Sequence, residues 1–256
     1  MTAGVAVVTV RGVFHLLSIA AEDVFADRRP PCPGCVRTFD GGRLSLADGE
    51  THFGFVLAGE CRVRDAAGEV ALCRGMWFCV PGEATVSGGR GIVCTRENWL
   101  GLRQFGGPVE STGRLRYIDG CRDTLLCGPP VLGDPCLNLL HIPPGTHQTA
   151  HTHPSLRAGV IVAGRGRCVT PGGEYPLTPG AAFVIEAETV HSFHTDDCDL
   201  RVIAYHPDSD TGPSHDDHPM VNRTIVDGVR AADIASIRTV SHRRERAESL
   251  AGARRR

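Results

Sequence analysis

Residues 145–164 read GTHQTAHTHPSLRAGVIVAG, and the interpretation of the chain begins from them. Within this stretch, His151 and His153 are separated by one residue and stand just before an apolar run that ends at Gly164. Alternate side chains of a β-strand point to the same face, so both imidazoles can reach one point. Imidazole is the commonest side-chain ligand of metals in proteins, and the pair therefore predicts a metal site.

A third histidine, His191, follows a second apolar run and a turn. Three neutral imidazoles can bind a divalent ion from one side and leave positions open for substrate or water. We therefore expect His151, His153 and His191 to be the metal ligands. His206, at the end of an alternating strand, is a weaker candidate that could also face the barrel interior. The alternative for two histidines at this spacing is a polar pair on a solvated strand face.

An internal repeat favours the metal site over that alternative. Shifting the sequence by 105 residues places His52–Val86 over Arg157–His191, and ten of these 35 positions are identical. Four of the identical positions are glycines, where strands are expected to turn. The positions that correspond to the three histidines are Leu46, Asp48 and Val86. One copy thus carries three imidazoles and the other none, which is the pattern expected of one functional and one structural barrel.

Short apolar runs that end in glycine predict strands, and helical periodicity is weak throughout the chain. We expect an all-β protein with two small barrels or sandwiches in tandem. The expected parts are an N-terminal arm at 1–38, a first barrel at 39–105, a second barrel at 115–206 and a C-terminal segment at 207–256. The arm is expected to contain a strand at Val5–Val10. The C-terminal segment is expected to contain a loop, a short helix near Ala231–Ile237 and a basic tail.

The composition limits the chemistry and the partners. All 27 basic residues are arginine, which excludes a lysine Schiff base and a P-loop lysine. The net charge of −2 does not call for a nucleic-acid partner, and no apolar run approaches the ~20 residues that a membrane span requires. We expect the partner to be a small anionic substrate, with no nucleic acid and no membrane; a homodimer is compatible with the sequence.

The cysteines favour a reducing compartment. The chain has 11 of them, an odd number without regular spacing, and it is too large to need a disulfide framework. We therefore expect reduced thiols and a cytoplasmic location. Cys32 and Cys35 form a CxxC pair, but no second pair accompanies them, so the motif is interpreted as incidental.

Residues 145–164 resemble the first sequence motif of the cupin superfamily. The matching positions are Gly145, His151, His153, Arg157 and Gly164, at the spacing of that motif. Cupins with four protein ligands usually have a glutamate where Arg157 stands, and this chain departs from the pattern there. A guanidinium stays protonated and cannot bind a cation, so the resemblance implies a site of histidines alone.

Residues 180–195 are similar to the second cupin motif, with several differences. Gly180 and His191 stand at the spacing of the motif, whereas Glu186 takes the usual proline position and Glu188 the usual glycine position. Thr195 stands where an asparagine is usual. Through the repeat, the resemblance extends over residues 40–206. It implies two tandem cupin barrels of the double-stranded β-helix or jelly-roll type, a degenerate N-terminal one and a C-terminal one with the metal site.

The resemblance also implies a site with excess positive charge, because three neutral ligands would face a divalent ion beside an arginine. Such a site favours an anionic ligand. Arg157 could hold a substrate carboxylate by a bidentate contact, or it could point outward to an acidic surface residue. Gln148 could hydrogen-bond a substrate near the barrel mouth. His147 could be a fourth ligand, an acid/base group or an exposed loop residue, and Glu186 or Glu188 could act as a base.

The cupins that this chain resembles include three-histidine iron dioxygenases for thiols, gentisate-type acids and β-diketones. We therefore expect a metal-dependent enzyme, an Fe(II) dioxygenase acting on a small anionic substrate that chelates the metal. Zn, Ni, Mn or Cu are alternatives to iron. A second hypothesis is a non-redox isomerase, cyclase or lyase, and a third is a non-catalytic ligand sensor. Fold-level analogy does not separate these three, because cupins serve many chemistries.

Overall fold

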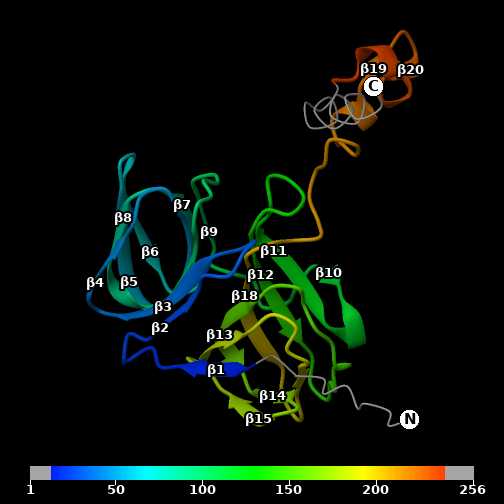
Figure 1. Ribbon diagram of the computed structural model, residues 1–256. Helices are drawn as coiled ribbons and strands as arrows, with labels where there is room; N and C mark the ends of the chain where they lie inside the picture. The colour runs from blue at the N-terminus through cyan, green and yellow to red at the C-terminus, as the bar shows by residue number, and fades with distance from the viewer. Residues whose placement is uncertain (1–12, 240–256) are drawn as a thin grey trace, which may run out of the picture.

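The computed structural model describes residues 13–239 and is built almost entirely of β-strands. Figure 1 shows two β barrels beside each other, with a C-terminal segment that extends away from both. The all-β prediction and the prediction of two tandem barrels are confirmed. Among the described residues, no helix is long and apolar enough to cross a membrane.

The N-terminal barrel is an antiparallel sheet of eight strands. The strand order is β2-β3-β8-β5-β7-β9, with β4 paired to β8 and β6 paired to β5. The strands are Val24–Asp27 (β2), Gly34–Asp40 (β3), Arg43–Leu46 (β4), Thr51–Asp65 (β5), Gly68–Cys73 (β6), Trp77–Pro81 (β7), Ala84–Arg96 (β8) and Gln104–Gly106 (β9).

The C-terminal barrel is formed by two antiparallel sheets, in the orders β1-β16-β13-β18-β12-β11-β10 and β15-β14-β17. A short 3₁₀ turn, Ile118–Gly120 (η1), precedes β11. The strands are Phe14–Leu17 (β1), Leu115–Arg116 (β10), Arg122–Cys127 (β11), Cys136–Ile142 (β12), Arg157–Gly164 (β13), Gly166–Thr170 (β14), Gly173–Leu177 (β15), Ala182–Ile185 (β16), Ser192–His194 (β17) and Leu200–His206 (β18).

The sequence repeat corresponds to a structural repeat. Strand β5 aligns with β13 and β14, β6 with β15, and β7 with β16. Three of the four repeated glycine pairs have positive φ in both copies, for example 73° at Gly59 and 76° at Gly164, and 133° at Gly68 and 137° at Gly173. These backbone angles disfavour any residue with a Cβ atom. At Gly164 an added Cβ would also lie 1.8 Å from the Asp199 carbonyl oxygen. The repeat therefore preserves the glycines because the backbone requires them.

The two barrels differ in what fills them. Inside the N-terminal barrel, Leu46, Phe78 and Val86 belong to one cluster of buried apolar side chains, and each is at most 2% exposed. Leu46 and Val86 are the positions that align with His151 and His191. The first barrel thus has a packed apolar core at the place where the second has imidazoles.

The barrels pack against each other through a shared apolar core. It combines Phe53 and Trp77 of the N-terminal barrel with Leu139 and Tyr205 of the C-terminal barrel. The rings of Phe53 and Tyr205 lie with their centroids 5.3 Å apart. Aromatic and aliphatic side chains of this size contribute most of the apolar area buried at such a contact. This core fixes the back of the sheet whose other face forms the candidate site.

In its described part, residues 13–38, the N-terminal segment is not a separate arm, and this corrects the boundary expected at residue 38. Strand β1 is the edge strand of the C-terminal barrel, where Phe14 pairs with Ile185. Strands β2 and β3 belong to the N-terminal sheet, where Gly34 pairs with Arg96. An edge strand satisfies the hydrogen-bonding groups that β16 would otherwise expose. The strand predicted at Val5–Val10 lies outside the described residues.

Within its described part, the C-terminal segment contains only short elements. They are the 3₁₀ turns Val221–Arg223 (η2), Ala231–Asp233 (η3) and Ala235–Ile237 (η4), and the hairpin Ile225–Val226 (β19) with Val229–Arg230 (β20). The short helix predicted near Ala231–Ile237 is therefore two separate 3₁₀ turns. The basic tail lies almost wholly beyond the described residues.

A buried histidine makes the stability of the N-terminal barrel depend on pH. The His52 side chain is fully buried, with Nδ1 2.9 Å from Thr95 Oγ1 and Nε2 3.0 Å from the Ala47 carbonyl oxygen. Burial lowers the pKa of His52. Below the unfolded-state pKa of about 6.5, the unfolded chain therefore binds more protons than the folded chain, and stability falls as pH falls. The slope per group is at most about 1.4 kcal/mol per pH unit.

We expect the metal-free protein to lose unfolding free energy between pH 7.0 and pH 5.5, and His52→Gln to lose less over the same interval. Urea unfolding in the presence of a chelator at both pH values measures this. Other buried histidines contribute equally to both proteins, so the difference between them isolates His52. Equal losses in the two proteins would contradict this assignment.

Candidate metal centre

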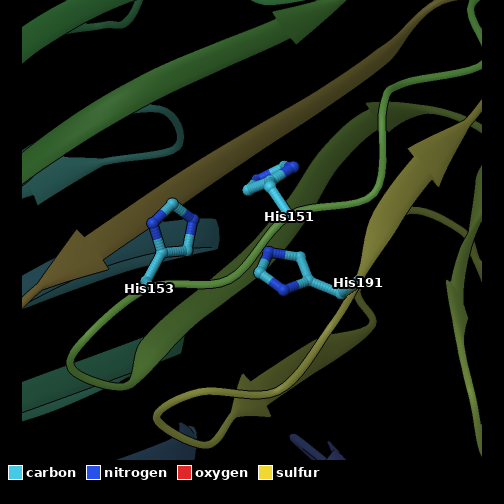
Figure 2. A group of neighbouring side chains, drawn as sticks. All are labelled: His151, His153 and His191. Carbon is cyan, nitrogen blue, oxygen red and sulfur yellow. The ribbon is translucent and has the colours of Figure 1, made fainter.

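Three imidazoles meet inside the C-terminal barrel (Figure 2). His151, His153 and His191 each offer a ring nitrogen, and these nitrogens all lie within 4.8 Å of one another. The ring centroids are 4.6 Å apart for His151 and His191, 5.0 Å for His151 and His153, and 5.2 Å for His153 and His191. Among residues 13–239, no carboxylate and no thiol joins the cluster. The predicted convergence of these residues is present in the structure.

Backbone hydrogen bonds hold the two sequence motifs together. His151 and His191 form an isolated antiparallel bridge, in which each N–H donates to the other's carbonyl oxygen at 3.0 and 2.9 Å. The Glu188 N–H donates to the His153 carbonyl oxygen at 2.8 Å. Glu188 has φ of 61°, so the glutamate adopts the backbone conformation for which the cupin motif uses glycine. The substitution that weakens the motif therefore leaves its turn intact.

Two of the histidines are oriented by their own neighbours. Nδ1 of His151 lies 2.8 Å from the Thr149 carbonyl oxygen, and Nδ1 of His191 lies 2.8 Å from the Thr189 carbonyl oxygen. A carbonyl accepts only, so each Nδ1 carries the hydrogen and each Nε2 keeps its lone pair. This is the arrangement in which an imidazole binds a metal.

Two of the three imidazoles, those of His153 and His191, are held in the neutral form that metal binding requires. Burial lowers the pKa of His153 to about 3, and the charge of Arg157 adds to this effect. Burial also lowers the pKa of His191 to about 4. Both rings are therefore neutral at pH 7, so no proton competes with a metal ion there.

The loop that carries the first motif is hydrogen-bonded to the end of the second motif. Thr195 Oγ1 accepts a hydrogen bond from the Thr146 N–H at 3.0 Å and donates to the Pro143 carbonyl oxygen at 2.5 Å. Thr195 is fully buried. It stands where cupins usually have asparagine, and its hydroxyl provides both a donor and an acceptor.

The histidines open onto a cavity of about 600 Å³, counted out to its open mouth. Strands β12, β13, β16 and β18 form much of its wall. Its apolar lining consists of Leu140, Ala158, Phe183, Ile185, Phe193, Val202 and Ala204. Its polar lining, apart from the three histidines, consists of Tyr117, Asp123, Asn138, Gln148, Arg157 and His206. A largely apolar cavity with a few polar groups is typical of a small-molecule site.

Arg157 lines this cavity and is not directed to the surface. Its side chain is 11% exposed and approaches Asp208 at 3.5 Å. Nη1 donates to Ser155 Oγ at 2.6 Å and to the Leu156 carbonyl oxygen at 2.9 Å. Nε is buried and has no hydrogen-bond partner among the described residues. The guanidinium is therefore held in place and keeps unused donor capacity.

Gln148 lines the cavity, as expected, whereas His147 does not. Gln148 is buried in the cavity wall, where Oε1 accepts from the Phe193 N–H at 3.2 Å and Nε2 lies 3.8 Å from Cys121 Sγ. His147 is exposed, and its Nδ1 lies 3.0 Å from Nδ1 of His194. Neighbouring side chains in this extended segment point to opposite sides. Because Gln148 points into the barrel, His147 points to solvent. His147 as a fourth ligand or an acid/base group in the cavity is therefore a wrong prediction.

Neither glutamate of the second motif lines the cavity. Glu186 binds the N-terminal segment, with Oε1 2.8 Å from His15 Nε2 and Oε2 3.1 Å from Arg29 Nη2. Glu188 lies in the positive-φ turn, and its N–H donates to the His153 carbonyl oxygen. The suggestion that either could act as a base is not supported by this placement, because a base must lie within hydrogen-bond reach of the substrate.

The sequence interpretation missed three polar residues of the cavity wall, Tyr117, Asp123 and Asn138. His206 was a weak candidate, and it lines the cavity with its ring centroid 6.3 Å from that of His153. A signal for Asn138 was available, because it is the one amide within the apolar strand Cys136–Ile142. No pattern in the sequence brings Tyr117 and Asp123 to the same wall.

Comparisons with known proteins agree with this architecture. The chain is similar in fold to salicylate 1,2-dioxygenase from Pseudaminobacter salicylatoxidans (TM-score 0.57, 11% identity, covering 80% of this chain and 88% of that one). It is also similar to Ylba from E. coli (TM-score 0.55, 14% identity, covering 78% and 93%). A cupin 2 conserved barrel domain protein from Leptotrichia buccalis has a TM-score of 0.52 at 10% identity, covering 80% and 91%.

At these identities, the likenesses show the fold alone. No curated protein matches the chain by sequence. The family model for the cupin domain matches residues 138–206, a range that contains all three clustered histidines. Residues 138–206 therefore form a cupin domain, and the chain has the fold of a two-barrel cupin protein with a three-histidine cluster in its second barrel.

Proposed function

We propose that the C-terminal barrel binds Fe(II) through His151, His153 and His191 and that the protein is a dioxygenase for a small anionic substrate. The observation that carries the proposal is the charge of the site. The cluster offers three neutral nitrogens and, among the described residues, no carboxylate, and a buried guanidinium lines the same cavity. The similarity of fold to a salicylate dioxygenase supports the choice of reaction class.

The charge balance selects an anionic substrate that binds the metal. A divalent ion among three neutral imidazoles keeps its full charge, and Arg157, whose charge Asp208 balances from 3.5 Å on one side only, adds to the positive potential. In a cavity with mostly apolar walls this charge is poorly screened. A carboxylate, an enolate or a hydroxide would neutralise it. Imidazole ligands suit Fe, Zn, Cu and Ni alike, so the choice of iron depends on the reaction proposed.

Arg157 is proposed to orient the substrate. Ser155 and Leu156 hold one side of the guanidinium, and Nε has no partner among the described residues. A substrate carboxylate could accept from Nε and Nη2 together, in the bidentate geometry that arginine favours. The held guanidinium loses little conformational freedom when the substrate binds.

The remaining wall is proposed to exclude water. Phe183, Ile185, Phe193 and Val202 cover the cavity with apolar surface. When bound, a redox-active metal would supply the oxygen chemistry, which protein side chains cannot. The side chains of this barrel would orient the substrate by Arg157 and keep bulk water from the reacting atoms.

Replacing any one of the clustered histidines is expected to abolish tight metal binding. We expect His151→Ala, His153→Ala and His191→Ala each to weaken the binding of Fe(II) or Zn(II) by at least about 100-fold, because even indirect contacts to a ligand contribute 10- to 100-fold. His147→Ala is the matched control and should retain the metal. Elemental analysis after anaerobic reconstitution and desalting measures the content, with circular dichroism to verify folding. Equal metal content in all four variants would overturn the assignment.

The Fe(II)-loaded protein is expected to consume dioxygen with a small carboxylic acid that bears a neighbouring hydroxyl or carbonyl oxygen. We expect Arg157→Met to raise KM by roughly 10- to 100-fold, the effect of losing a hydrogen bond to a charged group. Arg165→Met, at a surface ion pair with Asp197, is the matched control. An oxygen electrode and metal analysis provide the two measurements.

Turnover of a substrate under nitrogen, with a redox-silent metal bound, would replace the proposal with a non-redox isomerase, cyclase or lyase. Binding of a small molecule that is unchanged in metal-free protein and in His151→Ala would instead favour a sensor.

A further inference from the structure

The cavity wall contains, two and three strands away from β13, acceptors that the proposed reaction does not use. Asn138 is 6% exposed and lines the cavity, and its Nδ2 donates to Asp123 Oδ2. Asn138 Oδ1 is buried without a partner among the described residues. Leaving a buried acceptor unpaired is destabilising, so this arrangement calls for a compensating ligand.

The alternation of β12 confirms that Asn138 faces the barrel interior. Leu137 and Leu139 belong to the core shared between the barrels. Asn138 and Leu140, on the other face, line the cavity together with Ala204, which is the strand neighbour of Asn138. An apolar residue would fill this position without a polar cost. The amide is therefore exceptional in its surroundings.

Asp123 completes an acceptor pair. It is the one carboxylate among the residues that line the cavity, and it forms no ion pair with any residue in 13–239. Its hydrogen bond from Asn138 involves Oδ2, which leaves Oδ1 available. Burial raises the pKa of Asp123, whereas the hydrogen bond from Asn138 lowers it. A cation beside the carboxylate would stabilise its ionised form further.

Asn138 lies two strands from the strand that carries the guanidinium, and Asp123 lies three strands from it. Strands β13, β18 and β12 are consecutive in the sheet, and Gly159, Ala204 and Asn138 lie in one row across it. With about 4.8 Å between strands, the backbone of Asn138 lies about 10 Å from that of β13, which carries Arg157. A single small molecule can span this width. The cavity thus has donors on one side and acceptors on the other.

We propose that Asp123 and Asn138 bind a cationic amino group of the substrate, so that the ligand is an amino-substituted carboxylic acid. The carboxylate end would face Arg157 and the metal, and the ammonium would donate to Asp123 Oδ1 and Asn138 Oδ1. An ammonium is favoured over a hydroxyl because the half-buried carboxylate of Asp123 lacks a cationic partner among the described residues. This proposal rests on the proposed function for the placement of the carboxylate end.

Binding to protein loaded with redox-silent Zn(II) tests the proposal without any turnover. The probes are ω-amino acids of four to six carbons, with the ω-hydroxy acids and the unsubstituted carboxylic acids of the same lengths. For at least one length, we expect the amino acid to bind at least about tenfold more tightly than its unsubstituted counterpart in isothermal titration. Asp123→Asn and Asn138→Leu should each bring that ratio close to one. Asp197→Asn, at an exposed carboxylate outside the cavity, should preserve it.

Stability provides a second measurement, because a pair kept for structural reasons would behave differently. Without ligand, Asp123→Val/Asn138→Leu replaces both partners with apolar groups, and we expect its melting temperature to equal or exceed that of the wild type. A marked loss of stability in the double variant would indicate a structural role and overturn the proposal. An amino acid that binds no better than the hydroxy or unsubstituted acid would also overturn it. If Zn(II) and the probes bind as expected but the iron form consumes no oxygen, the proposed reaction fails and this inference stands.

Discussion

The site depends on one pair of backbone hydrogen bonds, those between His151 and His191. Neither histidine lies in a regular strand, so this bridge is what pairs the segment carrying the first motif with the second motif beside the histidine cluster, and a second bridge between His147 and His194 continues the pairing. Backbone groups donate and accept independently of side-chain identity. The bridge therefore tolerates the glutamates that replace proline and glycine in the second motif. The fastening of Thr146 to Thr195 supports the same junction from the other end.

Much of the fold was accessible from the sequence because the repeat made the glycines interpretable. Gly59 and Gly164 indicated turns, and both have positive φ. The histidine cluster was accessible because His151 and His153 are separated by one residue, and both rings turn inward although their segment is not a regular strand. The pairing of β1 with β16 was not accessible, since it joins residues about 170 positions apart and a four-residue edge strand has no distinctive pattern. The inward position of Asn138 could not be predicted, because the sequence does not show which face of β12 the other barrel covers.

The orientation of individual polar side chains was the least predictable feature of the site. His147 and Gln148 are neighbours, and alternation sends one to solvent and the other into the wall. The sequence alone does not show which of the two side chains faces solvent. Arg157 was ambiguous for the same reason, and burial beside Ser155 and Leu156 resolves its direction. Its departure from the usual glutamate changes the electrostatic character of the cavity more than its shape.

The pairing of the N-terminal strand β1 with the C-terminal barrel has a consequence for biosynthesis. Strand β1 leaves the ribosome long before its partner β16, which becomes available only after residue 185 has been made. The N-terminal barrel can assemble in the meantime, whereas the barrel with the histidine cluster remains open at one edge until β1 docks. The side chains of His15 and Arg29 then bind the carboxylate of Glu186 beside the β1–β16 pairing. A fragment that begins at the second barrel would lack its own closing strand, so the duplicated halves are not interchangeable modules that can be separated by cutting between them.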